Sequence, residues 1–278
     1  MGAGLLDICS SIEAVRGSGI SWGNAMFKSF LKNKQPKQEV PKGEGNRPLQ
    51  KAHFSSRRLN VLAEKLGANS YLEIGVHRGR TFFHTNVAMK HAVDPKFKFD
   101  PAEFEDATTR FFAMTSDDYF RNHADGQKFD LVFLDGLHVF EQTFRDFCSA
   151  LTLTHDRSVI IIDDTYPSDV YSACPDLAGA SLRDQYGGTG RGWHGDIFKM
   201  IFAIHDFFPM LSYATINTGG NPQTLVWRQA RQDFKPLLNS LEGVSRMTWF
   251  DLQRHLDTMN FIEEKAGLGR VVAALADK

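Results

Sequence analysis

Apolar and polar positions follow one another in a repeating strand, turn and helix pattern that begins near residue 55. Apolar residues at helical spacing predict a helix over residues 55–66, and Gly67 follows it as a stop signal. Beyond it, short apolar runs bounded by turn residues predict strands. The predicted strands cover residues 71–74, 91–94, 111–114, 129–134, 158–162, 213–216 and 223–227.

The order of these elements predicts the fold class and the division of the chain. Further helices are predicted over residues 81–90, 140–151 and 197–208. Strands that alternate with helices predict an α/β fold: a doubly wound, mostly parallel, seven-stranded Rossmann-like sheet with helices on both faces. We expect an N-terminal helical appendage and linker at 1–50, the main domain at 51–232, and a C-terminal helical extension at 233–278. Residues 167–195, punctuated by Gly and Pro, are predicted to form a lid insertion at the active site.

Composition and charge narrow the classes of partner. The 278 residues carry 32 Lys and Arg against 33 Asp and Glu, so no overall charge attracts nucleic acid or an anionic membrane. Cys9, Cys148 and Cys174 are far apart, which fits neither a disulfide framework nor a zinc site and favours a cytoplasmic location. No apolar run is long enough to span a membrane. A homo-oligomer is compatible with the sequence.

Two acidic positions and a glycine turn indicate a nucleotide-like ligand. The run Glu73-Ile-Gly-Val-His-Arg-Gly79 follows a predicted strand and has a carboxylate where dinucleotide binders have their first glycine. A cationic amino-acid ligand without a pyrophosphate needs such an acceptor. Asp94 ends the next strand, 21 residues later, where a carboxylate can bind ribose hydroxyls. The alternatives are a packing turn at the glycines and a strand-end turn at Asp94.

Three further carboxylates follow the two most apolar strands. Asp135 ends one strand and Asp163-Asp164 end the next, and neighbouring parallel strands bring their carboxyl ends together. Crowded carboxylates require a cation or raised pKa values, and their oxygens suit Mg²⁺. One of the pair could instead cap the following turn. His138 is a candidate general base or orienting group, or simply a residue at a helix start; His194 in the lid is a second candidate.

These motifs resemble those of class I S-adenosylmethionine-dependent methyltransferases, in particular the family of methyltransferase domain 24 and the sugar O-methyltransferases of macrolide and aminocoumarin pathways. The 28-residue spacing from Asp135 to Asp163 is also similar to the metal-ligand pattern of catechol O-methyltransferases. The resemblance covers roughly residues 55–228. It implies that the cofactor-binding residues are Glu73, Gly75, Val76, Gly79, Asp94, Ser116, Asp117 and Asp135, with Ser116 and Asp117 on the adenine side. It implies a metal site at Asp135, Asp163 and Asp164.

The resemblance implies methylation of a small-molecule acceptor, on a hydroxyl group, with S-adenosylmethionine as the methyl donor and Mg²⁺ assistance. Asp135 and His138 are the predicted catalytic residues, and Trp193 in the lid is expected to form an apolar wall for the acceptor. Two alternatives stay open. A nicotinamide-dependent oxidoreductase would need Gly in place of Glu73 and a pyrophosphate cradle. A hydroxylase-like or non-catalytic member of the same fold would retain the motifs without this reaction.

Overall fold

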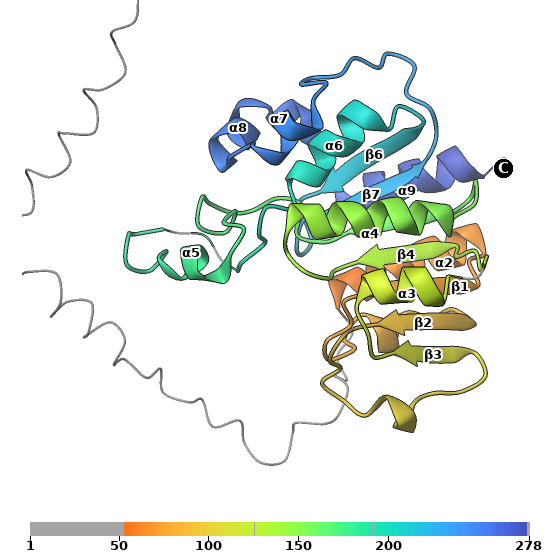
Figure 1. The fold of residues 1–278 in the computed structure, drawn as a ribbon. Helices are drawn as coiled ribbons and strands as arrows, with labels where there is room; N and C mark the ends of the chain where they lie inside the picture. The colour runs from red at the N-terminus through yellow and green to blue at the C-terminus, as the bar shows by residue number, and fades with distance from the viewer. Residues whose placement is uncertain (1–52, 125, 189, 191, 277–278) are drawn as a thin grey trace, which may run out of the picture. The chain divides into compact units, whose positions relative to one another are not determined.

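A computed structural model describes residues 53–124, 126–188, 190 and 192–276 of the chain. The predicted N-terminal appendage at 1–50 lies outside the described residues. The centre of the described part is an eight-stranded sheet (Figure 1). Its strands are β1 (Ser70–Ile74), β2 (Met89–Val93), β3 (Thr109–Phe112), β4 (Leu131–Leu134), β5 (Val159–Ile162), β6 (Leu211–Ile216), β7 (Gln223–Arg228) and β8 (Phe261–Ile262).

The strand order is β3-β2-β1-β4-β5-β7-β6-β8. The strands from β3 to β5 pair in parallel, whereas β7 runs antiparallel to both of its neighbours. The order reverses between β1 and β4, and in doubly wound sheets the ligand crevice opens at such a point. The predicted Rossmann-like, mostly parallel sheet is therefore confirmed. The additional strand, β8, comes from the C-terminal tail and pairs with β6.

Helices cover both faces of the sheet, as predicted. They are α2 (Phe54–Leu66), α3 (Ser116–Asn122), α4 (Phe140–Thr152), α5 (Leu177–Ser181), α6 (Lys199–Phe207), α7 (Leu241–Ser245), α8 (Trp249–Arg254) and α9 (Glu264–Leu275). Helices α3, α4 and α6 lie on one face, and α2 and α9 lie on the other (Figure 1). Successive strand residues point to opposite faces of the sheet, and the buried side chains form two apolar clusters. Leu72 belongs to one cluster and its neighbour Tyr71 to the other. Within the described part of the chain, no helix is long and apolar enough to cross a bilayer.

The predicted helix over residues 81–90 is wrong. The chain forms only a 3₁₀ turn at Phe82–His84 and then enters β2 at Met89. Phe82 is fully buried, and Phe83 packs edge-on against Phe99, so aromatic packing holds this segment in a tight turn. Residues 89–93 are extended because they pair with β1. Tertiary packing and strand pairing thus override the local helical spacing.

The C-terminal tail is joined to helix α2. Arg58 of α2 is fully buried, and its Nε donates to Glu264 at the start of α9 at 2.9 Å. Its two terminal nitrogens donate to the Asn221 and Thr218 carbonyls and to the Gln223 side chain. A buried charge is tolerated when it is paired and hydrogen-bonded in this way. These bonds fix the beginning of α2 beside the carboxyl edge of the sheet.

Candidate active site

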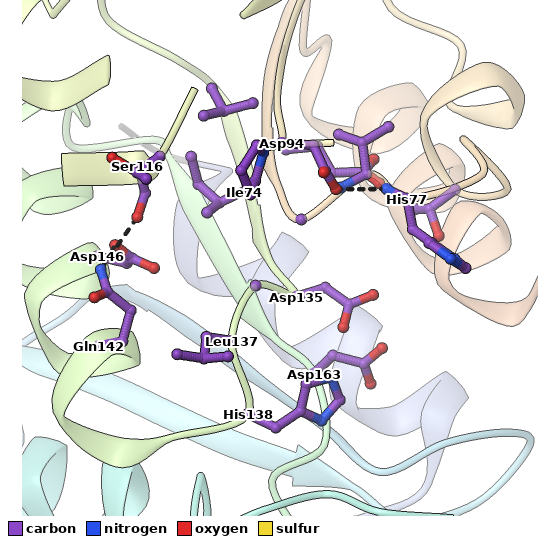
Figure 2. Close-up of a pocket in the computed structure, with 18 of the residues that line it drawn as sticks. Ile74, His77, Asp94, Ser116, Asp135, Leu137, His138, Gln142, Asp146 and Asp163 are labelled. Atoms are coloured by element: carbon purple, nitrogen blue, oxygen red, sulfur yellow. Dashed lines mark hydrogen bonds between the residues drawn. The ribbon is translucent and has the colours of Figure 1, made fainter. Parts of the chain in front are cut away.

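A cavity of about 890 Å³ opens beside the carboxyl ends of β1, β2 and β4 (Figure 2). Its size lies within the range of small-molecule sites, and its position matches the ligand crevice of a doubly wound sheet. The predicted cofactor residues that line it are Glu73, Gly75, Val76, Asp94, Ser116, Asp117 and Asp135. The sequence motifs thus meet at one cavity, although they are spread over more than 60 residues of the chain.

The two glycines of the loop after β1 have different structural tasks. Gly75 has a φ of +87°, and a Cβ there would stand 1.9 Å from the backbone oxygen of Asp135. Only glycine therefore lets β1 and β4 approach each other at the cavity floor. Gly79 does not line the cavity; its N–H donates to the Val76 carbonyl at 2.7 Å and closes the turn. Predicted as a cofactor-binding residue, Gly79 lies behind the wall that the ligand would contact.

Asp94 holds the glycine loop in place and also lines the cavity. Its Oδ2 accepts hydrogen bonds from the backbone N–H groups of Val76 at 3.0 Å and His77 at 2.7 Å (Figure 2). Its Oδ1 accepts from the Lys96 N–H at 2.7 Å. An ionised carboxylate has about four acceptor sites, so three bonds leave capacity for a ligand hydroxyl. Asp94 can therefore organise the loop and contact a ribose at the same time.

Glu73 is a buried acid at the base of the cavity. Only 2% of its surface is exposed, and the Tyr71 hydroxyl donates to its Oε2 at 2.5 Å. Burial raises the pKa of Glu73 to about 8, although the Tyr71 hydrogen bond and nearby Lys90 act in the opposite direction. The carboxyl group is thus largely protonated near neutral pH. A cationic ligand next to it would favour its ionised form.

A polar group from α3 and α4 lines another part of the cavity. Ser116 and Asp117 begin α3, where the Thr115 hydroxyl caps the helix. The Gln142 amide of α4 donates to Ser116 at 3.2 Å and to Asp146 at 3.0 Å (Figure 2). Asp146 is 3% exposed, and burial raises its pKa. The group offers acceptors to a polar, planar ligand edge, and among them the carboxyl group of Asp146 is buried.

The acids after β4 and β5 come together as expected, but their roles differ. A cluster of possible metal-ligand atoms forms here, one each from Asp135, His138 and Asp164, all within 4.8 Å of one another. It is the only such cluster among the described residues. Asp163 stands slightly apart: its Oδ1 accepts from the Asp164 N–H at 2.9 Å and from Asn221 at 2.7 Å. His138 therefore joins the cluster in the place predicted for Asp163, while Asp163 caps the turn.

Crowding and burial perturb these acids in different directions. Burial, followed by the charges of Asp163 and Asp164, raises the pKa of Asp135 well above its usual range. Burial and the neighbouring Asp164 raise the pKa of Asp163 to about 7. Burial also acts to raise the pKa of Asp164, but His138 outweighs it and the pKa is lowered. Asp164 is therefore the acid that retains its negative charge in this cluster.

Asp164 lies between two histidines. Its Oδ2 is 2.9 Å from His138 Nδ1, a charge contact whose direction does not meet hydrogen-bond geometry. Its Oδ1 is 3.3 Å from Nε2 of His194, whose Nδ1 is hydrogen-bonded to Ser172 at 2.9 Å. Burial lowers the pKa of His138, but the contact with Asp164 more than offsets it, and the net pKa is raised. His138 and Asp164 thus have the charge relation of a base and its orienting acid.

The predicted lid segment packs against His138. The Trp193 ring stacks on the imidazole of His138 with centroids 5.1 Å apart and planes at 15°. The Trp193 indole N–H donates to the Cys174 carbonyl at 2.7 Å, which fixes the ring. Gly195 has a φ of +63°, and a Cβ there would stand 1.7 Å from the His138 carbonyl oxygen. The role of this segment as a lid stays a prediction, but its described residues reach the candidate base directly.

Sequence reasoning missed several cavity residues. Gln142 and Asp146 stand one helical turn apart in α4, and Asp146 lies beside the buried Phe147. A carboxylate on the apolar face of an amphipathic helix was the available signal. His53 and Ser55 also line the cavity, but they come from the start of α2. No local pattern connects that helix start with the glycine loop, because only the packing of α2 brings them together.

Comparison with known families matches residues 72–165 to a model described as a methyltransferase domain, Methyltransf_24. The match begins in β1 and ends just beyond β5, so it includes the glycine loop, Asp94 and the three acids. Over these residues the chain is similar to a methyltransferase domain. This family match confirms the resemblance that the motifs indicated. A comparison with curated proteins finds no match.

Several solved structures are similar to this chain. An O-methyltransferase from Bacillus cereus in complex with SAH is 16% identical, with a TM-score of 0.47, over 66% of this chain and 84% of that one. The O-methyltransferase TomG from Streptomyces achromogenes, in complex with SAM, is 17% identical, with a TM-score of 0.43, over 63% and 80%. The SAH-bound methyltransferase PaMTH1 from Podospora anserina is 14% identical, with a TM-score of 0.46, over 64% and 80%.

Proposed function

We propose that this chain transfers the methyl group of S-adenosylmethionine to a hydroxyl group of a small-molecule acceptor. The observation that carries the proposal is the convergence of Glu73, Asp94 and Asp135 on one cavity beside the His138–Asp164 pair. The acids suit a donor that is cationic at its sulfonium and amino groups. The histidine suits an acceptor that must lose a proton. A nicotinamide cofactor is disfavoured, because Glu73 stands where a pyrophosphate would need a neutral glycine.

The donor's parts fit different walls of the cavity. Asp94 would accept one ribose hydroxyl with the capacity that its three backbone hydrogen bonds leave. The Ser116, Gln142 and Asp146 group offers acceptors for the amino group of adenine. Glu73 and Asp135 would then face the cationic half of the molecule. This orientation brings the reactive methyl group towards His138, where the acceptor would lie.

His138 would accept the proton of the acceptor hydroxyl as its oxygen attacks the methyl carbon. In this in-line displacement the oxygen–methyl bond forms as the sulfur–methyl bond breaks, and S-adenosylhomocysteine (SAH) leaves as the neutral thioether. Asp164 would stabilise the imidazolium, since it keeps its charge and lies 2.9 Å from Nδ1. Trp193, stacked on the same imidazole, would limit ring rotation and exclude water from the acceptor side.

We further propose that Mg²⁺ assists the methyl transfer. Asp135 and Asp164 offer the oxygen ligands that Mg²⁺ prefers, whereas the imidazole of His138 suits it less well. The raised pKa of Asp135 indicates that this acid lacks a countercharge, so the pair fits a divalent cation. Such a cation would supply Lewis-acid polarisation of the acceptor hydroxyl. Asp163, the third predicted ligand, would have to contribute its Oδ2, because Oδ1 already has two protein donors.

Calorimetric titration with SAH, S-adenosylmethionine and NAD tests the choice of cofactor. We expect the two adenosyl ligands to bind and NAD not to bind. Transfer of a labelled methyl group to a panel of hydroxylated and amino acceptors then tests the reaction class. Binding without transfer to any acceptor would favour a non-catalytic or hydroxylase-like member of the fold. A cytoplasmic location and the absence of nucleic-acid or membrane partners are further parts of this proposal, and a homo-oligomer is compatible with it.

A further inference from the structure

Basic side chains gather along one edge of the cavity whose floor is acidic. His77, Arg78 and Arg80 come from the loop after β1, and His53 precedes α2; all four line the cavity. The three side chains from the loop are exposed. Two segments of the chain therefore place basic groups at the mouth of the same site, within reach of a bound molecule.

The histidines of this edge report a positive electrostatic environment. The pKa of His53 is lowered to about 4 by burial and then by Arg80, the cation with the largest effect, with Arg58 and Arg57 adding to it. Partial burial of the His77 ring lowers its pKa, against the influence of Asp94, and Arg78 and Lys98 lower it further. Burial first, and the surrounding cations after it, thus lower the pKa of both imidazoles.

Arg78 and Arg80 have no acidic partner in the described part of the chain. No ion pair or side-chain hydrogen bond involves either guanidinium there, whereas Arg57 and Arg58 on the neighbouring helix both bind Glu264. A guanidinium binds planar carboxylates and phosphates through paired N–H donors. Two guanidinium groups at the mouth of a cavity have the chemistry to recognise an anionic group.

We propose that Arg78 and Arg80 form an anion-recognition edge that binds a carboxylate or phosphate on a molecule held in the cavity. The inference rests on the proposed function for the identity of that molecule, and two sources share the chemistry. One is the amino-acid carboxylate of the methyl donor. The other is an acidic group on the acceptor, which would then belong to the class of carboxylated or phosphorylated hydroxy compounds.

The first arm of the test compares SAH with 5′-methylthioadenosine, which lacks the amino-acid carboxylate and ammonium groups. Affinities are measured by calorimetry for the native chain, Arg78→Gln, Arg80→Gln and the control Arg246→Gln, an exposed residue away from the cavity. If the edge binds the donor, an arginine variant loses roughly ten-fold or more in SAH affinity, the effect of one charge-assisted bond. Binding of 5′-methylthioadenosine stays unchanged, and Arg80→Lys retains part of the SAH affinity.

The second arm titrates inorganic phosphate into SAH-saturated protein. If the edge serves the acceptor, phosphate binds to the native chain and to Arg246→Gln, and an arginine variant loses roughly ten-fold or more of that affinity while its SAH affinity is kept. The proposal is overturned if neither variant changes SAH or phosphate binding. It is also overturned if a variant weakens both adenosyl ligands equally, since that indicates a damaged loop. Failure of both adenosyl ligands to bind the native chain refutes the proposed function instead, and the phosphate arm, repeated without SAH, still tests the edge.

Discussion

Replacing Glu73 by Gln is expected to stabilise the ligand-free protein, with a gain that grows as the pH rises. Burial raises the pKa of this acid from 4.5 to about 8 in the folded state. A raised carboxyl pKa contributes stability below the unfolded value of 4.5, and this contribution is lost as the pH rises through about 8. As the pH rises, the native chain thus carries a growing cost of keeping this acid protonated and, above about pH 8, of ionising it in a buried site; the neutral amide avoids both.

The size of the effect follows from the shift. A difference of about 3.5 pKa units corresponds to roughly 5 kcal/mol, reached in full above about pH 8. Near pH 7 the expected gain in the free energy of unfolding of Glu73→Gln is about 3 kcal/mol, and near pH 5 it is less than about 1 kcal/mol. The amide oxygen of Gln can still accept the Tyr71 hydroxyl bond, so packing at the site is retained. The pH dependence is therefore the distinctive signature of Glu73.

Urea unfolding near pH 5, 7 and 9 measures this signature on the native chain and on Glu73→Gln. The exposed Glu103 provides the control, since Glu103→Gln removes a carboxylate of the same type at the surface. The same difference in unfolding free energy at all three pH values would refute the reasoning. Calorimetry of S-adenosylmethionine binding in two buffers of different ionisation enthalpy adds a second readout. A cationic ligand that restores the charge of Glu73 releases up to about 0.9 proton near pH 7, and Glu73→Gln abolishes that release.

Three further substitutions test other parts of the site. Gly75→Ala places a Cβ 1.9 Å from the Asp135 carbonyl oxygen, so thermal unfolding should show destabilisation by at least about 2 kcal/mol; a fully stable variant contradicts this packing. Asp94→Asn weakens its charge-assisted bonds to the loop and the ribose, and SAH affinity should fall by about 1.5 to 3 kcal/mol in calorimetry. Asp164→Asn should lower the rate of methyl transfer, and Mg²⁺ added back after chelation should stimulate this variant less than the native chain. Full turnover of the native chain in excess chelator would exclude the metal.

The fold could be predicted largely because its signals are local. Buried strands such as β4 and β5 are continuous apolar runs, and Gly67 marks a helix end through its left-handed backbone. The segment at 81–90 could not be assigned in this way. Its helical spacing was outweighed by aromatic packing around Phe82 and by the pairing of β2 with β1. These contacts join residues that are distant in the sequence, so no window of the chain contains them.

In the candidate site, too, some features could be predicted from the sequence and others are decided only by the tertiary structure. Glu73, Asp94 and Asp135 could be placed at one crevice from the sequence alone, because each follows a strand and parallel strands end at the same edge. Only the tertiary structure decided that His138 faces Asp164 while Asp163 caps a turn, because the choice depends on contacts with His138 and Asn221, which are distant from the acids in the sequence. It also brought the basic residues at the start of α2 and after β1 to one cavity mouth. The sequence determines which groups lie near the strand ends, and packing determines which atoms face one another.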